Sequence, residues 1–336
     1  MSPDGTPLLV LALVAVALTA VLIAVGWDRG GRLRWPLRLV AVVAALLSVS
    51  ATVLVQLNRM TEAYSTDAEP EPEAGPEPAA EETPGGSQLL TVTVAGKASG
   101  LTSTMYVYLP AAYRTGTQRF PVMEALHGYP GSPRTWLRKL QVRSRLDTEI
   151  AEGRMAPAVV LFAPNTPRQL LDTECTNLRG GPQSETFLTV DVPAYAMAHF
   201  RVRTDRAGWG LIGYSAGGYC ASSLALRHPD RYAAAASMSG LAGPEIVVGD
   251  GTEDTLHNVV WRLEHLPRPP VALWIGWADD EQGTRRDALR IARAARPPVS
   301  VTTAMVQRGG HSHAVWRQME GPAFDWLSAH LARPLP

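Results

Sequence analysis

The first sixty residues carry two long apolar runs. Residues 8–25 and 39–57 contain no charged side chain and consist mainly of Leu, Val and Ala, and each is close to the about 20 residues that a helix needs to cross a bilayer. A signal peptide would begin with basic residues and end at a cleavage site, whereas this chain begins M-S-P-D-G-T-P and continues into a second run. We therefore expect residues 1–60 to form a two-helix transmembrane anchor.

The loop between the two runs predicts the orientation of this anchor. It carries four basic residues, Arg29, Arg32, Arg34 and Arg38. Because basic loops remain on the cytoplasmic side, both ends of the anchor and everything after it are expected outside the cytoplasm, at the cell membrane.

Residues 61–88 have a different composition, rich in Glu, Pro, Ala and Gly with no Lys or Arg. Such a segment cannot bury enough apolar surface to offset the entropy of ordering it, and its prolines keep it extended. We expect an acidic, proline-rich linker and assign it no specific partner.

From residue 89 to residue 336, β-forming runs alternate with helical patterns. We expect strands at 90–94, 104–109, 122–126, 158–162, 208–214, 233–238, 271–275 and 299–305, and helices at 133–152, 186–200, 215–227, 256–264, 284–295 and 315–331. The first two strands are predicted to form an antiparallel hairpin at a sheet edge. The later alternation is typical of an α/β fold with a mostly parallel sheet covered by helices on both faces.

The pentapeptide Gly213-Tyr214-Ser215-Ala216-Gly217 lies between a predicted strand and a predicted helix. A G-x-S-x-G pattern often arises by chance, but in this position it indicates a nucleophile elbow, a strained turn that exposes the serine hydroxyl. Ser215 is therefore the candidate nucleophile. The N–H of Ala216, at the helix start, is a candidate donor to an oxyanion.

Other candidate residues follow strands whose carboxyl ends should gather at the same edge of the sheet. Tyr129, in the Gly-rich turn after 122–126, offers a second candidate oxyanion N–H. His127 is interpreted as a structural residue of that turn, because in this chain order the base follows the acid.

The acid and the base are expected in the last two loops. Asp279, Asp280 and Glu281 follow 271–275; we favour Asp279 as the carboxylate that orients the base, keep Asp280 as the alternative and interpret Glu281 as solvated surface. His311 follows two glycines after the last strand and is preferred to His313 as the base. The H-x-H pair has no third ligand at suitable spacing, so we expect no metal and no cofactor.

The loop after 158–162 contains Asp172, Glu174 and Cys175. Its acids are suited to recognise a positively charged or hydroxyl-bearing substrate group, or are simply solvated in a loop stapled by Cys175. The chain has two cysteines, and pairing of Cys175 with Cys220 remains open at this point because it depends on an oxidising compartment.

The motifs G-Y-S-A-G-G-Y-C-A, H-G-Y-P-G and G-G-H-S-H-A-V-W resemble those of the esterase D and mycolyltransferase-related esterases, an α/β-hydrolase family, over about residues 89–332. N-R-M-T-E-A-Y after the second run is similar to membrane-bound bacterial members. The resemblance implies Ser215 as nucleophile, His311 as base and Asp279 as acid, with oxyanion N–H groups from Tyr129 and Ala216. Many mycolyltransferases use a glutamate as the acid, so an aspartate fits the plain esterases better.

Charge excludes one class of function: 31 basic and 31 acidic residues balance, and no basic, aromatic-interleaved surface is evident, so nucleic acid is not an expected partner. The sequence predicts a membrane-anchored extracytoplasmic serine esterase acting on lipid or envelope esters, including aminoacylated phospholipids. An acyltransferase that passes the acyl group to an envelope hydroxyl, and a tethered binding protein on an inactive hydrolase scaffold, are the alternatives.

Overall fold

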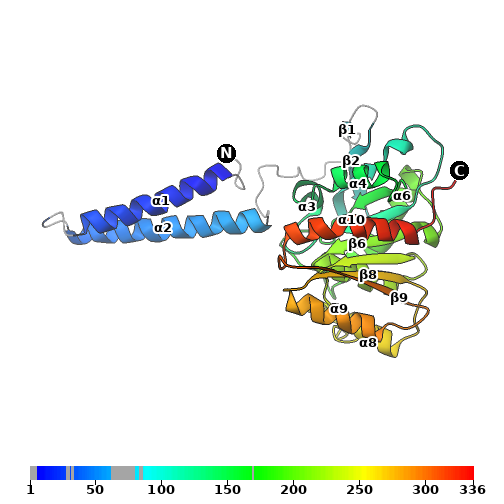
Figure 1. Ribbon diagram of the computed structural model, residues 1–336. Coiled ribbons are helices and arrows are strands. Elements are labelled where there is room, and N and C mark those ends of the chain that lie inside the picture. The colour runs from blue at the N-terminus through cyan, green and yellow to red at the C-terminus, as the bar shows by residue number, and fades with distance from the viewer. Residues whose placement is uncertain (1–5, 28–30, 32–33, 62–79, 83–85, 169) are drawn as a thin grey trace. The chain divides into compact units, whose positions relative to one another are not determined.

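The computed structural model describes residues 6–27, 31, 34–61, 80–82, 86–168 and 170–336. The chain divides into two compact units, Met1–Glu71 and Pro72–Pro336, and each is described separately (Figure 1). The division falls inside the predicted linker.

The first unit contains helices α1 (Thr6–Gly26) and α2 (Arg34–Thr61). They pack against each other, and the hydroxyls of Thr19 and Ser48 lie 3.3 Å apart across the pair. Within the described residues, Leu9–Gly26 and Arg34–Gln56 are long and apolar enough to cross a membrane. These properties suit a membrane anchor or a signal sequence. Of the predicted basic loop, Arg29 and Arg32 lie outside the described residues.

The second unit is built on one mixed sheet. Its described strands are β1 (Ala80–Glu82), β2 (Gln88–Ala95), β3 (Thr102–Leu109), β4 (Val122–Leu126), β5 (Val159–Phe162), β6 (Trp209–Tyr214), β7 (Ala234–Met238), β8 (Ala272–Ala278) and β9 (Ser300–Val306). They lie in the order β1-β2-β3-β5-β4-β6-β7-β8-β9. The pairings from β1 to β3 and between β3 and β5 are antiparallel, and those from β5 through β4 to β9 are parallel. This is the α/β-hydrolase arrangement that the sequence predicts.

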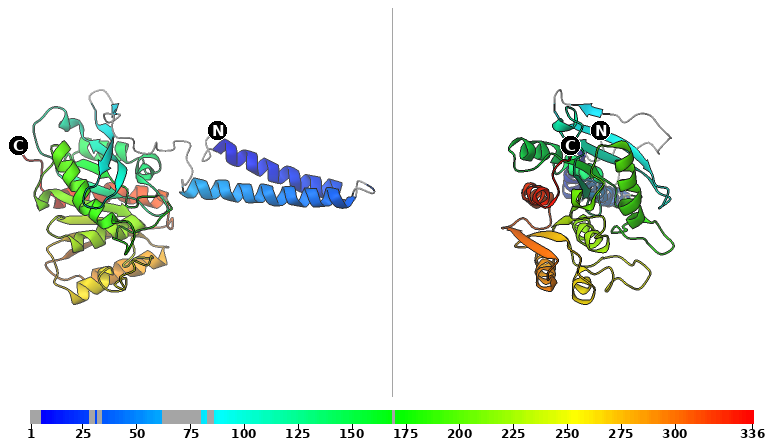
Figure 2. Two further views of the ribbon diagram at one scale, coloured as in Figure 1. Left: turned by 180° about the vertical axis from the view of Figure 1, so that it is seen from behind. Right: turned by 90° about the vertical axis from the view of Figure 1, so that its right-hand side faces the viewer.

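Helices cover both faces of this sheet (Figure 2). The described helices are α3 (Pro133–Arg138), α4 (Val142–Ala151), α5 (Ser184–Thr186), α6 (Val192–His199), α7 (Ala216–Arg227), α8 (Val259–His265), α9 (Gln282–Ala294) and α10 (His313–His330), with short 3₁₀ turns at Ala111–Tyr113 and Arg206–Gly208. Helices α6 to α9 pack on one face, and α3, α4 and α10 on the other. On β6, Leu211 enters the first core and Ile212 the second. Strand β6, buried on both faces, therefore reads as a continuous apolar run.

Two helices predicted as continuous are interrupted. Residues 133–152 form α3 and α4, because Gln141 adopts a left-handed conformation (φ 57°) that ends one helix before the next begins. Residues 186–200 contain a π-helical turn, Phe187–Asp191, before α6. Pro193 at the start of α6 has no N–H to donate to the preceding turn, which favours this wider turn. Of the predicted linker, the structure describes residues 61, 80–82 and 86–88, and the rest lies outside the described residues. Strand β1 pairs there with β2, with Ala80 opposite Leu90.

One acidic residue lies inside the sheet and makes stability depend on pH. Glu124 on β4 is fully buried, and the Tyr232 hydroxyl donates to its Oε1 at 3.2 Å. Burial raises the pKa of Glu124 from 4.5 to about 8. Between pH 4.5 and 8, the Glu124 carboxyl is therefore protonated in the folded protein but ionised in the unfolded chain. The free energy of unfolding falls as pH rises through that window.

We expect Glu124→Gln to remove this contribution, whose slope is at most about 1.4 kcal/mol per pH unit. Urea denaturation of wild-type and variant protein in detergent at pH 5, 6.5 and 8 measures it. The variant should gain stability relative to wild type as pH rises. Parallel pH profiles for the two proteins would contradict the assignment.

Candidate active site

Ser215 occupies a strained turn between β6 and α7. Its backbone has φ 56° and ψ −128°, a conformation that non-glycine residues rarely adopt. The turn brings two chain segments so close that a Cβ at Gly213 would overlap the Gly217 carbonyl, and a Cβ at Gly217 would overlap that of Leu126. These two glycines are therefore required where the sequence has them, and the strain lifts the Ser215 side chain out of the sheet edge.

His311 reaches Ser215 from the loop after β9. Its Nε2 lies 2.7 Å from the Ser215 Oγ. Gly309 and Gly310 both have positive φ, 139° and 59°, so the loop needs residues without a side chain there. The imidazole packs edge-on against Trp316 of α10, with ring centroids 4.9 Å apart. This contact limits how far the ring can turn away from the serine.

The carboxylate beside His311 belongs to Glu281. Its Oε1 lies 2.5 Å from the His311 Nδ1, and its side chain is 12% exposed. Asp279, the residue favoured from the sequence, is instead 46% exposed and forms an ion pair with Arg285 at 2.9 Å. The prediction that Asp279 lies beside the imidazole, with Glu281 at the solvated surface, was wrong: the structure places Glu281 beside His311 and Asp279 at the surface.

The length of β8 explains this difference. The strand continues to Ala278, three residues past the predicted end, and the Asp279 N–H still bonds to the Val306 carbonyl at 2.9 Å. The turn toward His311 therefore comes two residues later than expected. The glutamate that the resemblance associates with many mycolyltransferases is a signal that could have favoured Glu281, but we used it to set the chain apart from them.

Asp280, the alternative acid, holds the backbone of the histidine loop instead of the imidazole. Its carboxylate accepts the N–H of Gly309 and of Gly310 at about 3.1 Å each. These two hydrogen bonds lower the pKa of Asp280. Adjacent acids of one loop thus contact the side chain of His311 and the backbone before it.

Tyr129 and Ala216, the candidate oxyanion donors, line the same cleft as Ser215 and His311. As the first residue of α7, Ala216 has an N–H without an intrahelical acceptor. Gly128 brings the Tyr129 turn close, since a Cβ there would lie 3.0 Å from the Ser215 Cβ. His127 is buried, its Nδ1 lies 2.8 Å from the Gly128 carbonyl, and burial lowers its pKa to about 4. It is a structural residue of the turn.

The cleft has a volume of about 280 Å³ and contains acids from several loops. Its other lining residues are Asp172, Glu174, Tyr219, Ser239, Leu241, Glu245, Gly283 and Thr284, besides Glu281. In the part of the chain that the structure describes, no group of three His, Cys, Asp or Glu side chains is arranged to hold a metal ion.

Comparison with known proteins identifies the family of the chain. The model of a family described as "Putative esterase" matches residues 97–330. The chain belongs to this esterase family. Its fold is similar to that of an S-formylglutathione hydrolase from Agrobacterium tumefaciens (TM-score 0.64, 15% identity, 76% of this chain and 100% of the other) and of a ferulic acid esterase (TM-score 0.62, 21% identity, 74% and 99%). The protein therefore has an α/β-hydrolase fold.

The curated sequence relatives either have low identity over most of the chain or match only a short part of it. An uncharacterized protein of Corynebacterium glutamicum is 25% identical over an alignment of 263 positions that covers 71% of this chain and 61% of that protein. The diacylglycerol acyltransferase/mycolyltransferase Ag85A of Mycobacterium leprae is 37% identical over 65 residues, 19% of each chain. The esterase therefore spans less than two thirds of the length of these relatives.

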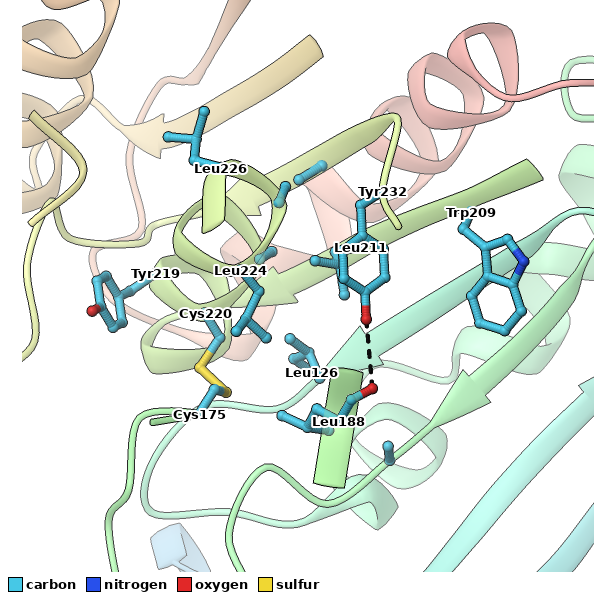
Figure 3. Close-up of a cluster of buried hydrophobic side chains, with 14 of the residues drawn as sticks. Leu126, Cys175, Leu188, Trp209, Leu211, Tyr219, Cys220, Leu224, Leu226 and Tyr232 are labelled. Carbon is cyan, nitrogen blue, oxygen red and sulfur yellow. Dashed lines mark hydrogen bonds between the residues drawn. A yellow bond between two sulfur atoms is a disulfide. The ribbon is translucent and has the colours of Figure 1, made fainter. Parts of the chain in front are cut away.

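A disulfide lies close to Ser215 in the sequence of α7. Cys175, in the loop after β5, is bonded to Cys220 of α7, and both are buried (Figure 3). The bond ties the loop that carries Asp172 and Glu174 to the helix that begins next to Ser215. The pairing that the sequence left open is therefore formed in the structure.

Proposed function

We propose that this esterase hydrolyses carboxylic esters through an acyl-enzyme on Ser215. The observation that carries the proposal is the continuous contact from the Glu281 carboxylate through the His311 imidazole to the Ser215 hydroxyl. His311 Nε2 takes the Ser215 proton as Oγ attacks the ester carbonyl, and returns it to the leaving alcohol. Glu281 fixes the tautomer in which Nδ1 carries the proton and stabilises the imidazolium.

The negative charge that develops on the carbonyl oxygen requires donors on the other side of Ser215. The backbone N–H groups of Tyr129 and Ala216 take this role in our proposal, since both residues line the cleft at the nucleophile. Water then attacks the acyl-enzyme, with His311 as the base, and the acid is released.

We further propose that residues 1–60 anchor the enzyme in the cell membrane, that 61–88 act as a linker and that 89–336 form the catalytic domain outside the cytoplasm. Two helices of sufficient length and a buried disulfide support this proposal, because disulfides persist in oxidising compartments. An enzyme held near the outer leaflet is suited to lipid or envelope esters, aminoacylated phospholipids among them.

A second candidate function is acyl transfer to an envelope hydroxyl. The local similarity to the Mycobacterium leprae acyltransferase supports it. Both reactions share the acyl-enzyme and differ in whether water or an alcohol receives the acyl group. Product analysis after adding trehalose or glycerol as acceptor distinguishes them, because transfer gives a new ester whereas hydrolysis gives only free acid.

We expect the full-length protein in detergent to hydrolyse p-nitrophenyl esters and to lose that activity when a fluorophosphonate reacts with it. The phosphonate should be found on Ser215 by peptide mass spectrometry, because a strained, base-contacted serine is the activated nucleophile. Substrate added in advance should slow the labelling. Hydrolysis that persists after complete labelling of Ser215 would refute the proposed mechanism.

A further inference from the structure

Three carboxylates outside the proposed catalytic group line the cleft of Ser215. Asp172 and Glu174 come from the loop after β5, and Glu245 comes from the loop after β7. We call these three residues the acidic wall. Because two separate segments of the chain deliver acids to one small cleft, the acidic wall is a property of the fold and not of one acidic stretch of sequence.

The acidic wall is held together by its own backbone. The Glu245 N–H donates to the Glu174 Oε2 at 2.7 Å, and the Glu174 N–H donates to the Asp172 Oδ1 at 3.0 Å. Glu174 is only 4% exposed, whereas Glu245 is exposed. The charged groups that act on Glu174 are the carboxylates of Asp172 and Glu245, both negative.

Ionisation of the acidic wall is unfavourable. Burial, and next the charge of Asp172, raise the pKa of Glu174 to about 8. Burial, and then the charge of Glu245, raise the pKa of Asp172 as well. With a pKa near 8, Glu174 is mostly protonated at neutral pH. A positive group entering the cleft would favour its ionised form and replace the lost hydration, so it would be bound in preference to a neutral group of the same shape.

A separate feature of the cleft also points to a ligand. Ser239, the first residue after β7, lines the cleft and is 1% exposed, yet its Oγ has no hydrogen-bond partner among the described residues. Buried hydroxyls are rarely left without a partner. Its oxygen can accept an N–H from an ammonium group, while the described acids are not arranged to chelate a metal ion.

We propose that the acidic wall, with Ser239, binds a cationic group of the substrate, so that the preferred esters carry an organic cation such as an ammonium close to the ester bond. This inference rests on the proposed function and specifies its substrate class. The cation belongs either to the acyl part, as in an amino-acid ester, or to the alcohol part, as in a choline ester.

The test compares cationic esters with neutral esters of matched shape, using the full-length enzyme in detergent and acid release as the readout. For the acyl side, butyl alaninate is paired with butyl isobutyrate. For the alcohol side, butyrylcholine is paired with 3,3-dimethylbutyl butyrate. In at least one pair the cationic ester should have a kcat/KM about tenfold higher or more. The pair that shows the preference identifies the side that carries the charge.

Variants then locate the source of the preference. Glu174→Gln and, because Glu174 is buried and could be needed for folding, the exposed Glu245→Gln should each lower the ratio of cationic to neutral kcat/KM about tenfold. Asp254→Asn, an exposed acid of the same loop as Glu245 that does not line the cleft, should leave the ratio unchanged. Equal rates for both members of each pair in the wild type, or a preference that survives in both Gln variants, would overturn the acidic wall as a cation site.

Failure of the proposed function gives a different result. If neither these esters nor p-nitrophenyl esters are hydrolysed, the esterase reaction itself is refuted. Binding of tetramethylammonium, measured by calorimetry on the same proteins, then still tests the acidic wall. Binding that is weakened in both Gln variants but not in Asp254→Asn supports the acidic wall, and equal binding by all four proteins overturns it.

Discussion

Replacing Glu281 with glutamine is expected to lower kcat for ester hydrolysis by about 10³ to 10⁴. A glutamine of the same shape can still contact the His311 Nδ1, but it does not stabilise the imidazolium and it allows the wrong tautomer. The Glu281 side chain is 12% exposed against 45% for His311. Water therefore has little access to take over the role of its charge in the variant. Measurement of kcat and KM for one p-nitrophenyl ester is sufficient, and the loss should fall mainly on kcat.

Asp279→Asn provides the matched control. Asp279 belongs to the same loop, but its partner is Arg285 at the protein surface, and exposed ion pairs contribute little to stability. We expect less than about a twofold change in kcat from this substitution. A large loss in Asp279→Asn with a small one in Glu281→Gln would reverse the assignment made from the geometry.

Removal of the disulfide is expected to lower the free energy of unfolding by about 4 kcal/mol. Cys175 and Cys220 are 45 residues apart in the sequence, and a cross-link that closes a loop of this length restricts the unfolded chain by roughly this amount. Because both residues are buried, the double change to alanine avoids burying new hydroxyl groups. Urea denaturation of the oxidised wild type and the double variant measures the difference.

The reduced wild type serves as the control for this measurement, since it has the same side chains without the bond. Its unfolding midpoint should move toward that of the double variant. If neither reduction nor substitution changes the midpoint, the bond does not contribute to stability. The loop that carries Glu174 is also attached through Cys175, so the preference for cationic esters should weaken in parallel.

Local signals in the sequence predicted the neighbourhood of Ser215 and His311 well. Gly213 and Gly217 are needed because the backbone passes too close for a Cβ, and Gly309 and Gly310 because of their positive φ. Most of these requirements arise within the turns themselves, although Gly217 also lies against Leu126 of β4. The parallel direction of the later strands was predicted from the alternation of apolar runs and helical patterns. A connection between two parallel strands usually contains a helix.

The acid was harder to predict because its choice depends on where a strand ends in the sheet. Pairing with β9 extends β8 to Ala278, and that pairing involves residues far away in the sequence. A shift of two residues then exchanges Asp279 for Glu281. The break at Gln141 was missed because no glycine or proline marks it.

The proposed catalytic residues follow strands that differ in how well neighbouring strands protect them from local opening. Ser215 follows β6, which has β4 and β7 on its two sides, whereas His311 follows β9, an edge strand, whose Met305 is 52% exposed. Edge elements with exposed side chains open locally at lower free-energy cost than the centre of a sheet. Heat or denaturant would then detach the base while the nucleophile remains folded, so that inactivation is a sub-global event that precedes unfolding of the domain.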